Sequence, residues 1–289
     1  RIPGGNLIHF VSGKGGVGKS LVAASLAQAL SEEGRRTLLV ELGGSHFFEY
    51  IYGEKIGFEP TELRPGLSLS LWDGEACLKE YLLYLLKFAK IVDLFFDNTI
   101  MQALVHGAPG LKELALTGKI TSRERKIGPE LPYDDLVIDA YSTGHFLALL
   151  SAPLAMAKAI SIGPMGAQSR SVHQVLSSEV CEYLVVVNPE ELPLTEGEEL
   201  AAGIDAQVGR SAKWVKNRWW PQLSEPLDQV PKGFQENWKR KLDLQNQFDS
   251  KSLRETAMVL PQIWSHSNLE KIELLTKLWK SKRESGGDL

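Results

Sequence analysis

The sequence has 289 residues, of which 43% are hydrophobic and 24% are charged, a composition typical of a globular protein with a large core. Its net charge of -4 argues against a protein that holds duplex DNA along its phosphates, because such proteins usually carry a basic surplus. The most apolar stretch, residues 81–104, contains four charged side chains, whereas a membrane-spanning helix needs about 20 mostly apolar residues.

The two cysteines, Cys77 and Cys181, lie far apart in the sequence, and no CxxC motif occurs. This spacing predicts neither a zinc site nor a disulfide framework. Reduced thiols are typical of the cytoplasm, and we expect the protein to be cytoplasmic.

Strand patterns alternate with helical patterns along most of the chain. Residues 6–12 have the pattern of a buried strand that runs into a glycine-rich turn. Residues 20–33 have a helical pattern, because Val22, Leu26 and Leu30 recur at intervals of four and Gly34 follows as a stop. Further strand patterns cover residues 36–41, 67–72, 136–139, 183–187, 214–217 and 257–260. This alternation predicts one α/β domain over residues 1–289, with a mostly parallel, doubly wound sheet of about seven to eight strands.

Two regions depart from this alternation. Residues 75–116 are apolar on more than one helical face and show no strand pattern, so we predict a helical subdomain at about residues 75–130. Its apolar side chains either all pack on the sheet or partly face a hydrophobic client or protein partner. Residues 232–254 are polar and charged, which is typical of a solvated helix or a long loop.

The segment Gly13-Lys-Gly-Gly-Val-Gly-Lys-Ser20 matches the phosphate-loop pattern G-x-x-x-x-G-K-[ST], which arises by chance about once per 30,000 positions. A strand pattern precedes the loop and a helical pattern follows it, as a P-loop requires. Backbone N–H groups and the helix N-terminus would bind phosphate oxygens, Lys19 would reach the β- and γ-phosphates, and Ser20 would ligate Mg²⁺. We therefore predict ATP and Mg²⁺ as cofactors, bound by Gly13, Lys14, Gly15, Gly16, Val17, Gly18, Lys19, Ser20 and Leu21.

A second metal-binding candidate is Asp139, which follows an apolar strand pattern. A carboxylate at that strand end is placed to hold Mg²⁺ through water, as a Walker B acid does.

The lysine directly after the first glycine, Lys14, resembles that of the deviant Walker A group, which includes ParA, MinD, nitrogenase iron proteins, ArsA and the tail-anchored-protein targeting ATPases. The resemblance implies that Lys14 reaches across a dimer interface to the partner's nucleotide. The alternative is an ordinary solvated loop lysine.

Later motifs are similar to the ArsA and tail-anchored branch. Residues 139–145 match the pattern D-T-A-P-T-G-H at Asp139, Thr143, Gly144 and His145. Residues 108–114, 144–150 and 189–196 also resemble bacterial ArsA-like ATPases, so the likeness runs from about residue 6 to residue 275, with residues 232–254 unmatched. The two separate cysteines supply neither the arsenite-binding cysteine cluster nor the zinc-binding CxxC found in parts of this family.

The same resemblance implies three further nucleotide contacts. Glu190 corresponds to a glutamate that contacts nucleotide across the dimer, Asn217 to the asparagine that reads adenine, and Pro261 to the start of the loop beside the base. Their alternative interpretations are a loop glutamate, a capping asparagine and a turn proline.

The switch region after the second strand differs from the family pattern D-P-A-H-x-L-x-D, whose last aspartate orients the attacking water. Here Glu41 begins the segment and Phe48 occupies the water-orienting position. A phenyl ring cannot position a water, so either Glu49 substitutes for the aspartate or hydrolysis is slow. The catalytic candidates are therefore Lys14, Lys19 and Glu49.

Three functions fit these features. The leading one is Mg²⁺-dependent ATP binding and slow hydrolysis that drives closure of a homodimer, or of a heterodimer with a paralogous ATPase. The second is a nucleotide-binding pseudo-ATPase that pairs with an active paralogue. The third is a ParA- or MinD-like positioning protein, because Ile272, Leu275, Leu278 and Trp279 form an apolar stripe flanked by basic residues. A core-facing helix explains the same stripe, so we expect no nucleic acid and at most peripheral membrane contact.

Overall fold

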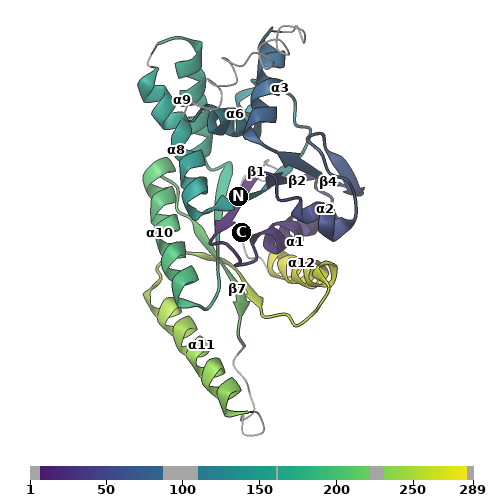
Figure 1. Ribbon diagram of the computed structural model, residues 1–289, viewed down its shortest axis with the longest axis vertical. Helices are drawn as coiled ribbons and strands as arrows, with labels where there is room; N and C mark the ends of the chain where they lie inside the picture. The colour runs from purple at the N-terminus through teal and green to yellow at the C-terminus, as the bar shows by residue number, and fades with distance from the viewer. Residues whose placement is uncertain (1–6, 87–109, 161, 222–230, 285–289) are drawn as a thin grey trace.

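The computed structural model describes residues 7–86, 110–160, 162–221 and 231–284, which form a sheet with helices on both faces (Figure 1). The sheet has eight strands in the order β3-β4-β2-β5-β1-β6-β7-β8. All neighbouring strands pair in parallel except β3 and β4, which are antiparallel. The prediction of a mostly parallel α/β sheet is thus confirmed. The strands are β1 Leu7–Gly13, β2 Thr37–Leu42, β3 Thr61–Arg64, β4 Leu67–Trp72, β5 Asp135–Ser142, β6 Cys181–Val187, β7 Lys213–Trp219 and β8 Thr256–Pro261.

Strand β3 has no counterpart among the strand patterns identified in the sequence. It is four residues long and forms a hairpin with β4 through Pro65 and Gly66, whose φ of 80° suits a glycine in a tight turn. The Pro-Gly pair before an alternating run is the signal that identifies this edge hairpin.

Two helical layers cover the sheet. On one face lie α1 (Lys19–Glu32), α2 (Phe47–Tyr52) and α12 (Asn268–Glu284), and on the other lie α8 (Thr143–Ala159) and α10 (Glu191–Val208) (Figure 1). Each face has its own hydrophobic core. A strand buried on both faces must be apolar along its length, which explains runs such as Cys181–Val187.

Helix α12 carries the apolar stripe near the C-terminus and packs it against α1. Ile272, Leu275 and Trp279 are at most 4% exposed. The indole nitrogen of Trp279 donates a hydrogen bond of 3.1 Å to the Ser25 hydroxyl, and Lys280 pairs with Glu32 at 2.9 Å. The stripe is therefore a core face, which removes the feature that suggested a membrane-bound positioning protein.

The described part of the predicted helical subdomain consists of α3 (Gly74–Leu86), α6 (Leu111–Ile120) and α7 (Ser122–Arg125). The stretch 87–109, which holds much of the proposed client surface, lies outside the described residues. Helices α3 and α6 lie close together, since a Cβ added at Gly74 would come within 2.9 Å of the Lys112 carbonyl oxygen. Helix α9 (Pro164–Leu176) packs beside α8 at the same end of the molecule (Figure 1).

The polar stretch 232–254 forms a long helix, α11 (Lys232–Lys251), instead of a loop. It is not solvated all round, because Trp238, Gln245 and Phe248 are buried. The Gln245 amide accepts from the Trp220 N–H at 2.7 Å and donates to the Trp220 carbonyl at 3.0 Å. These bonds attach α11 to the chain that leaves β7.

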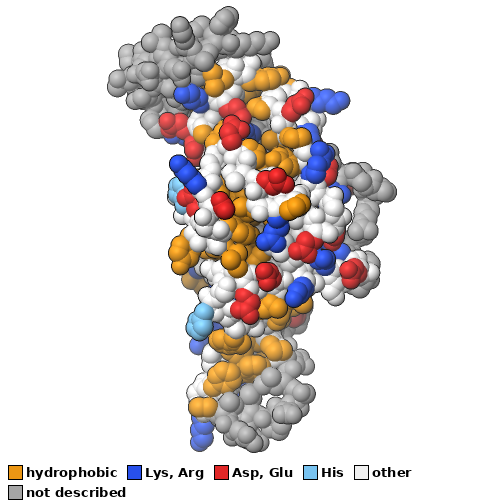
Figure 2. All heavy atoms as spheres, turned by 90° about the vertical axis from the view of Figure 1, so that its right-hand side faces the viewer, with side chains coloured by type: hydrophobic (Ala, Val, Ile, Leu, Met, Phe, Trp, Pro, Cys, Tyr) orange, Lys and Arg blue, Asp and Glu red, His pale blue; other side chains and the backbone are white. Residues whose placement is uncertain are grey.

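Where the chain is described, no helix combines the length and apolar character needed to cross a membrane. On the face seen in Figure 2, acidic, basic and hydrophobic side chains are interspersed, and neither sign of charge dominates. Among the described residues of that face, the basic side chains do not gather into one large patch.

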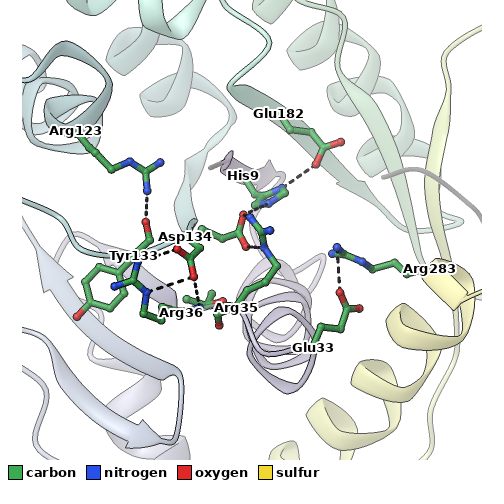
Figure 3. Close-up of polar contacts among 11 residues, drawn as sticks. His9, Glu33, Arg35, Arg36, Arg123, Tyr133, Asp134, Glu182 and Arg283 are labelled. Carbon is green, nitrogen blue, oxygen red and sulfur yellow. Dashed lines mark hydrogen bonds and ion pairs between the residues drawn. The ribbon is translucent and has the colours of Figure 1, made fainter. Parts of the chain in front are cut away.

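A buried charged network joins the amino-terminal ends of the central strands (Figure 3). His9 of β1 lies between two carboxylates, with Nδ1 2.8 Å from Glu182 Oε2 and Nε2 3.6 Å from Asp135 Oδ1. Arg35 donates to the same Asp135 oxygen at 2.9 Å. Burial alone would lower the His9 pKa, but the two carboxylates raise it to about 9. Against the opposing effect of burial, His9 and Arg35 lower the pKa of Asp135 to about 2.

Candidate nucleotide site

The glycine-rich loop joins the carboxyl end of β1 to α1, and two of its glycines are required by geometry. Gly13 has a φ of 150°, and an added Cβ there would lie 2.5 Å from the Val186 carbonyl oxygen. Gly18 has a φ of 94°, and its Cβ would lie 2.5 Å from the amide nitrogen of Asn217. The loop therefore approaches β6 and β7 more closely than side chains would allow.

The ammonium group of Lys19 lies within this loop. It donates a hydrogen bond of 3.1 Å to the carbonyl of Lys14. Burial lowers the pKa of Lys19, and the charge of Asp139 works in the opposite direction. The cation is thus held at the start of α1, where a phosphate would also meet the helix dipole.

Asp139 lies at the carboxyl end of β5, opposite Val11 of β1 and Glu41 of β2 in the strand register. It is 7% exposed, and no described residue donates a hydrogen bond to its Oδ1 oxygen. Burial raises the pKa of Asp139 to about 7, and Glu41 adds to this effect, while the Ser20 hydroxyl and Lys19 oppose it.

This arrangement fits a magnesium ion. A buried carboxylate with a free oxygen is costly unless a cation or donor compensates for it. The Asp139 carboxylate and the Ser20 hydroxyl supply the oxygen ligands that Mg²⁺ prefers, directly or through water. The structure thus brings together the two residues proposed for metal binding, although they lie 119 positions apart in the sequence (139 − 20).

Lys14 forms an ion pair with Glu196 of α10. The two side chains are 27% and 28% exposed, so the pair lies at the surface of the loop and not in the core. In a single chain the Lys14 amine is therefore held by its own α10, and its role toward a partner chain stays a prediction.

Two asparagines attach the loop to neighbouring strands. Asn217 of β7 is 5% exposed and donates a 2.7 Å hydrogen bond to the Val17 carbonyl. Asn188, which follows β6, can donate to the same carbonyl at 3.1 Å with its amide oriented to satisfy both of its atoms. Asn217 therefore has a loop-holding role, and its contact with adenine stays a prediction. Asn188 was not identified from the sequence, where its position after a strand and before Pro189 is the available signal.

Glu190 and Pro261 lie farther along the same edge of the sheet. Glu190 precedes α10 and pairs with Lys241 of α11 at 3.3 Å, beside a shallow groove between these helices. Pro261 is the last residue of β8 and lies opposite Trp219 of β7. Their nucleotide contacts also stay predictions.

The switch region is anchored by Glu41 and Phe48. The Glu41 carboxylate accepts hydrogen bonds from the backbone N–H groups of Phe47 and Phe48 at 3.0 and 3.3 Å, and from the Ser45 hydroxyl. The Phe48 ring is fully buried and packs against Phe47 and Tyr52. Phe48 thus belongs to the core and has no route to a water at the phosphate.

Glu49, the nearest carboxylate in the sequence, is bound locally. It accepts the Ile56 N–H at 2.8 Å and lies 2.7 Å from Nδ1 of His46. The Ile56 N–H is the main reason that the pKa of Glu49 is lowered, and His46 adds to the effect. A low pKa makes a carboxylate a weak proton acceptor near neutral pH.

A glycine-rich loop between a central parallel strand and a helix, with a carboxylate on the neighbouring strand, defines a P-loop nucleotide-binding protein. The family model described as anion-transporting ATPase matches residues 7–165, which is more than half of the chain. The chain therefore belongs to this ArsA-type ATPase family.

Several named ATPases are similar to the chain over part of its length. The chain is 33% identical over 240 residues to ATPase BagA of Mycobacterium tuberculosis, a match that covers 76% of this chain and 67% of BagA. It is 30% identical over 173 residues to ATPase GET3 of Mycosarcoma maydis, covering 56% of this chain and 49% of that protein. It is also 28% identical over 152 residues to ATPase ASNA1 homolog 1 of Paramecium tetraurelia, covering 53% and 45%.

Proposed function

We propose that this ArsA-family chain binds Mg·ATP on residues 13–21, hydrolyses it slowly, and uses the nucleotide to close a homodimer or a heterodimer with a paralogous ATPase. The observation that carries the proposal is the buried Asp139 carboxylate, whose free oxygen lies at the strand end beside Ser20 and Lys19. A cation bound with ATP would compensate for the buried charge of this carboxylate.

The residues have separate tasks in this proposal. Lys19 and the loop N–H groups hold the phosphates, and Ser20 and Asp139 hold the metal. When bound, Mg²⁺ would neutralise charge on the β- and γ-phosphates. Lys14 would leave Glu196 and contact the partner's nucleotide. The residues that would lie near the nucleotide are Glu190, Asn217 and Pro261. Glu49 would take part in activating the water, in place of the aspartate that Phe48 replaces.

A second candidate is a pseudo-ATPase that holds nucleotide and pairs with an active paralogue. The burial of Phe48 at the water-orienting position favours it. Turnover of the purified chain, alone and mixed with a paralogue, separates the two functions. A client on the helical subdomain is compatible with either one.

The decisive binding experiment is Lys19→Ala. Loss of a charged hydrogen-bond partner costs about 1.5–3 kcal/mol, so the affinity for Mg·ATP should fall roughly tenfold or more. Calorimetry measures this directly, and Lys126→Ala, at a lysine outside the loop, is the control. Unchanged affinity in Lys19→Ala would refute the nucleotide site.

A further inference from the structure

The turn between β2 and α2 places His46 beside the acidic end of the nucleotide site. Its two sequence neighbours, Ser45 and Phe47, both donate hydrogen bonds to the Glu41 carboxylate. Glu41 is the register partner of Asp139, and its charge acts on the Asp139 carboxyl. Since consecutive Cα atoms are about 3.8 Å apart, the backbone of His46 lies between the two residues that are bonded to Glu41, at the end of β2 where the neighbouring strand β5 carries Asp139.

His46 and Glu49 form a dyad with a defined direction. His46 Nδ1 lies 2.7 Å from Glu49 Oε2. An ionised carboxylate can only accept a hydrogen bond, so Nδ1 must carry the proton. In the neutral ring the other nitrogen, Nε2, then has a free lone pair. The His46 side chain is 53% exposed, so water can reach it.

The backbone at His46 is also unusual. Its φ is 51°, one of three positive values among the described residues other than glycine. Such a conformation persists only where the surroundings fix it, and it is concentrated at functional sites. Here the bonds from Ser45 and Phe47 to Glu41 fix the chain on both sides of His46.

We propose that His46 is the catalytic residue that holds and deprotonates the attacking water, and that Glu49 is the positioning residue that orients its ring. In this step the water oxygen forms a bond to the γ-phosphorus while the bond from that phosphorus to the β–γ bridging oxygen breaks. The bridging electron pair leaves with ADP, and the water proton passes to His46 Nε2 and then to solvent. The inference rests on the proposed ATPase function and supplies the group that Phe48 does not.

Direct activation by Glu49 fits the structure less well. Each of its oxygens already accepts one hydrogen bond, Oε1 from the Ile56 N–H and Oε2 from His46. Asp139 is engaged with Ser20 and Lys19 in the metal site. The open Oδ1 oxygen of Asp139 is assigned to the metal, so of these three groups His46 supplies the open acceptor, Nε2, that remains for a water.

The test measures single-turnover hydrolysis and ATP affinity in four variants. His46→Asn is chosen because asparagine tolerates a positive φ. We expect it to lower the hydrolysis rate at least tenfold, with ATP affinity and melting temperature near those of the wild type. Glu49→Gln should lower the rate less, because the amide oxygen still accepts from Nδ1. The exposed residues His266 and Glu54 supply the controls His266→Asn and Glu54→Gln, which should leave the rate unchanged.

The double variant His46→Asn/Glu49→Gln distinguishes the dyad from direct activation by Glu49. If Glu49 acts only through His46, the double variant is as slow as His46→Asn alone. If Glu49 holds the water itself, its loss slows hydrolysis further, which would overturn the assignment. As a second line, free imidazole should restore part of the rate to His46→Gly.

The hydrolysis rates distinguish failure of the proposed ATPase function from failure of the dyad. Wild-type hydrolysis no faster than that of Lys19→Ala would refute both the proposed ATPase function and the dyad. Lys19-dependent hydrolysis that is unchanged in His46→Asn and Glu49→Gln would refute the dyad alone.

Discussion

At the scale of single residues, the buried charge of Asp139 should destabilise the folded protein. Its carboxylate is buried, and no described donor reaches Oδ1. Replacing it with the neutral isostere in Asp139→Asn should raise the free energy of unfolding by on the order of 1–3 kcal/mol above neutral pH, while weakening Mg²⁺-dependent ATP binding. Denaturant titration and calorimetry measure the two effects. A variant that is destabilised and still binds Mg·ATP normally would contradict a metal site at this position.

Phe48 limits what can be engineered in the switch region. Because its ring is fully buried, Phe48→Asp should cost at least about 3 kcal/mol of stability, which is a large part of the roughly 5–15 kcal/mol typical of a protein. The matched control is Tyr50→Asp on the same helix, since Tyr50 is 82% exposed and its change should cost under about 0.5 kcal/mol. Thermal unfolding of both variants checks this. A Phe48→Asp protein as stable as Tyr50→Asp would show that the ring is not needed in the core.

The P-loop residues could be proposed from the sequence because the pattern is local: eight consecutive residues contain the glycines, the lysine and the hydroxyl. Asp139 could also be proposed from the sequence, because the carboxyl ends of parallel strands meet at one edge of a sheet. The ion pair of Lys14 with Glu196 and the hydrogen bond from Asn217 to Val17 join residues 182 and 200 positions apart. Contacts of this range depend on how helices and strands pack, and no local pattern encodes them.

At the scale of elements, α10 holds the P-loop through Glu196. The variant Glu196→Gln should release the Lys14 amine, and dimerisation in ATP should then tighten about two- to fivefold, since an exposed ion pair contributes about 0.2–1 kcal/mol. Sedimentation velocity with ATP and with ADP measures the effect. Glu199→Gln, an exposed carboxylate on the same helix, is the control, and Lys14→Ala should abolish the gain. A dimerisation constant for Glu196→Gln equal to that of the wild type would leave Lys14 as an ordinary loop lysine.

The elements also show which patterns are reliable. Helix α1 was expected at residues 20–33 and is observed at Lys19–Glu32, because its apolar spacing and glycine stop agree with its packing. Strand β3 was missed because an alternation of apolar and polar residues cannot be recognised over only four residues. In α11 the buried apolar side chains include Trp238 and Phe248. Charged residues outnumber them, so the average polarity of the segment did not indicate that one face of the helix packs against the protein.

At the scale of the whole molecule, the charged network and the nucleotide site occupy opposite ends of β1. His9 and Asp135 belong to the amino-terminal ends of β1 and β5, whereas Gly13 and Asp139 belong to the ends nearest the nucleotide. In the sequence His9 is one polar residue within an apolar strand. Only the order β5-β1-β6 in the sheet brings carboxylates from both neighbours to it, and this order follows from the packing of the complete chain.

This network should make stability depend on pH. The pKa of His9 is raised to about 9 in the folded protein, compared with about 6.5 in an unfolded chain. Folding therefore favours the protonated ring, so the stabilisation is complete below about pH 6.5 and is lost as the pH rises through about 9. Asp135 behaves in the opposite way, because its lowered pKa of about 2 confers stability that is lost only in strong acid. The free energy of unfolding should fall by roughly 3 kcal/mol between pH 6 and pH 10 through His9.

Denaturant titrations across this pH range measure the effect, and His9→Gln provides the comparison. The variant keeps a hydrogen-bonding side chain but cannot take up a proton, so it should be less stable than the wild type at pH 6 and should approach it at pH 10. Lys213 and Arg35 also face these carboxylates. The wild type and His9→Gln both retain them, so their titration cancels in the difference in stability between the two proteins. Equal pH dependence in the wild type and in His9→Gln would mean that His9 is neutral in the folded protein and that the two carboxylates are balanced by Arg35 and Lys213.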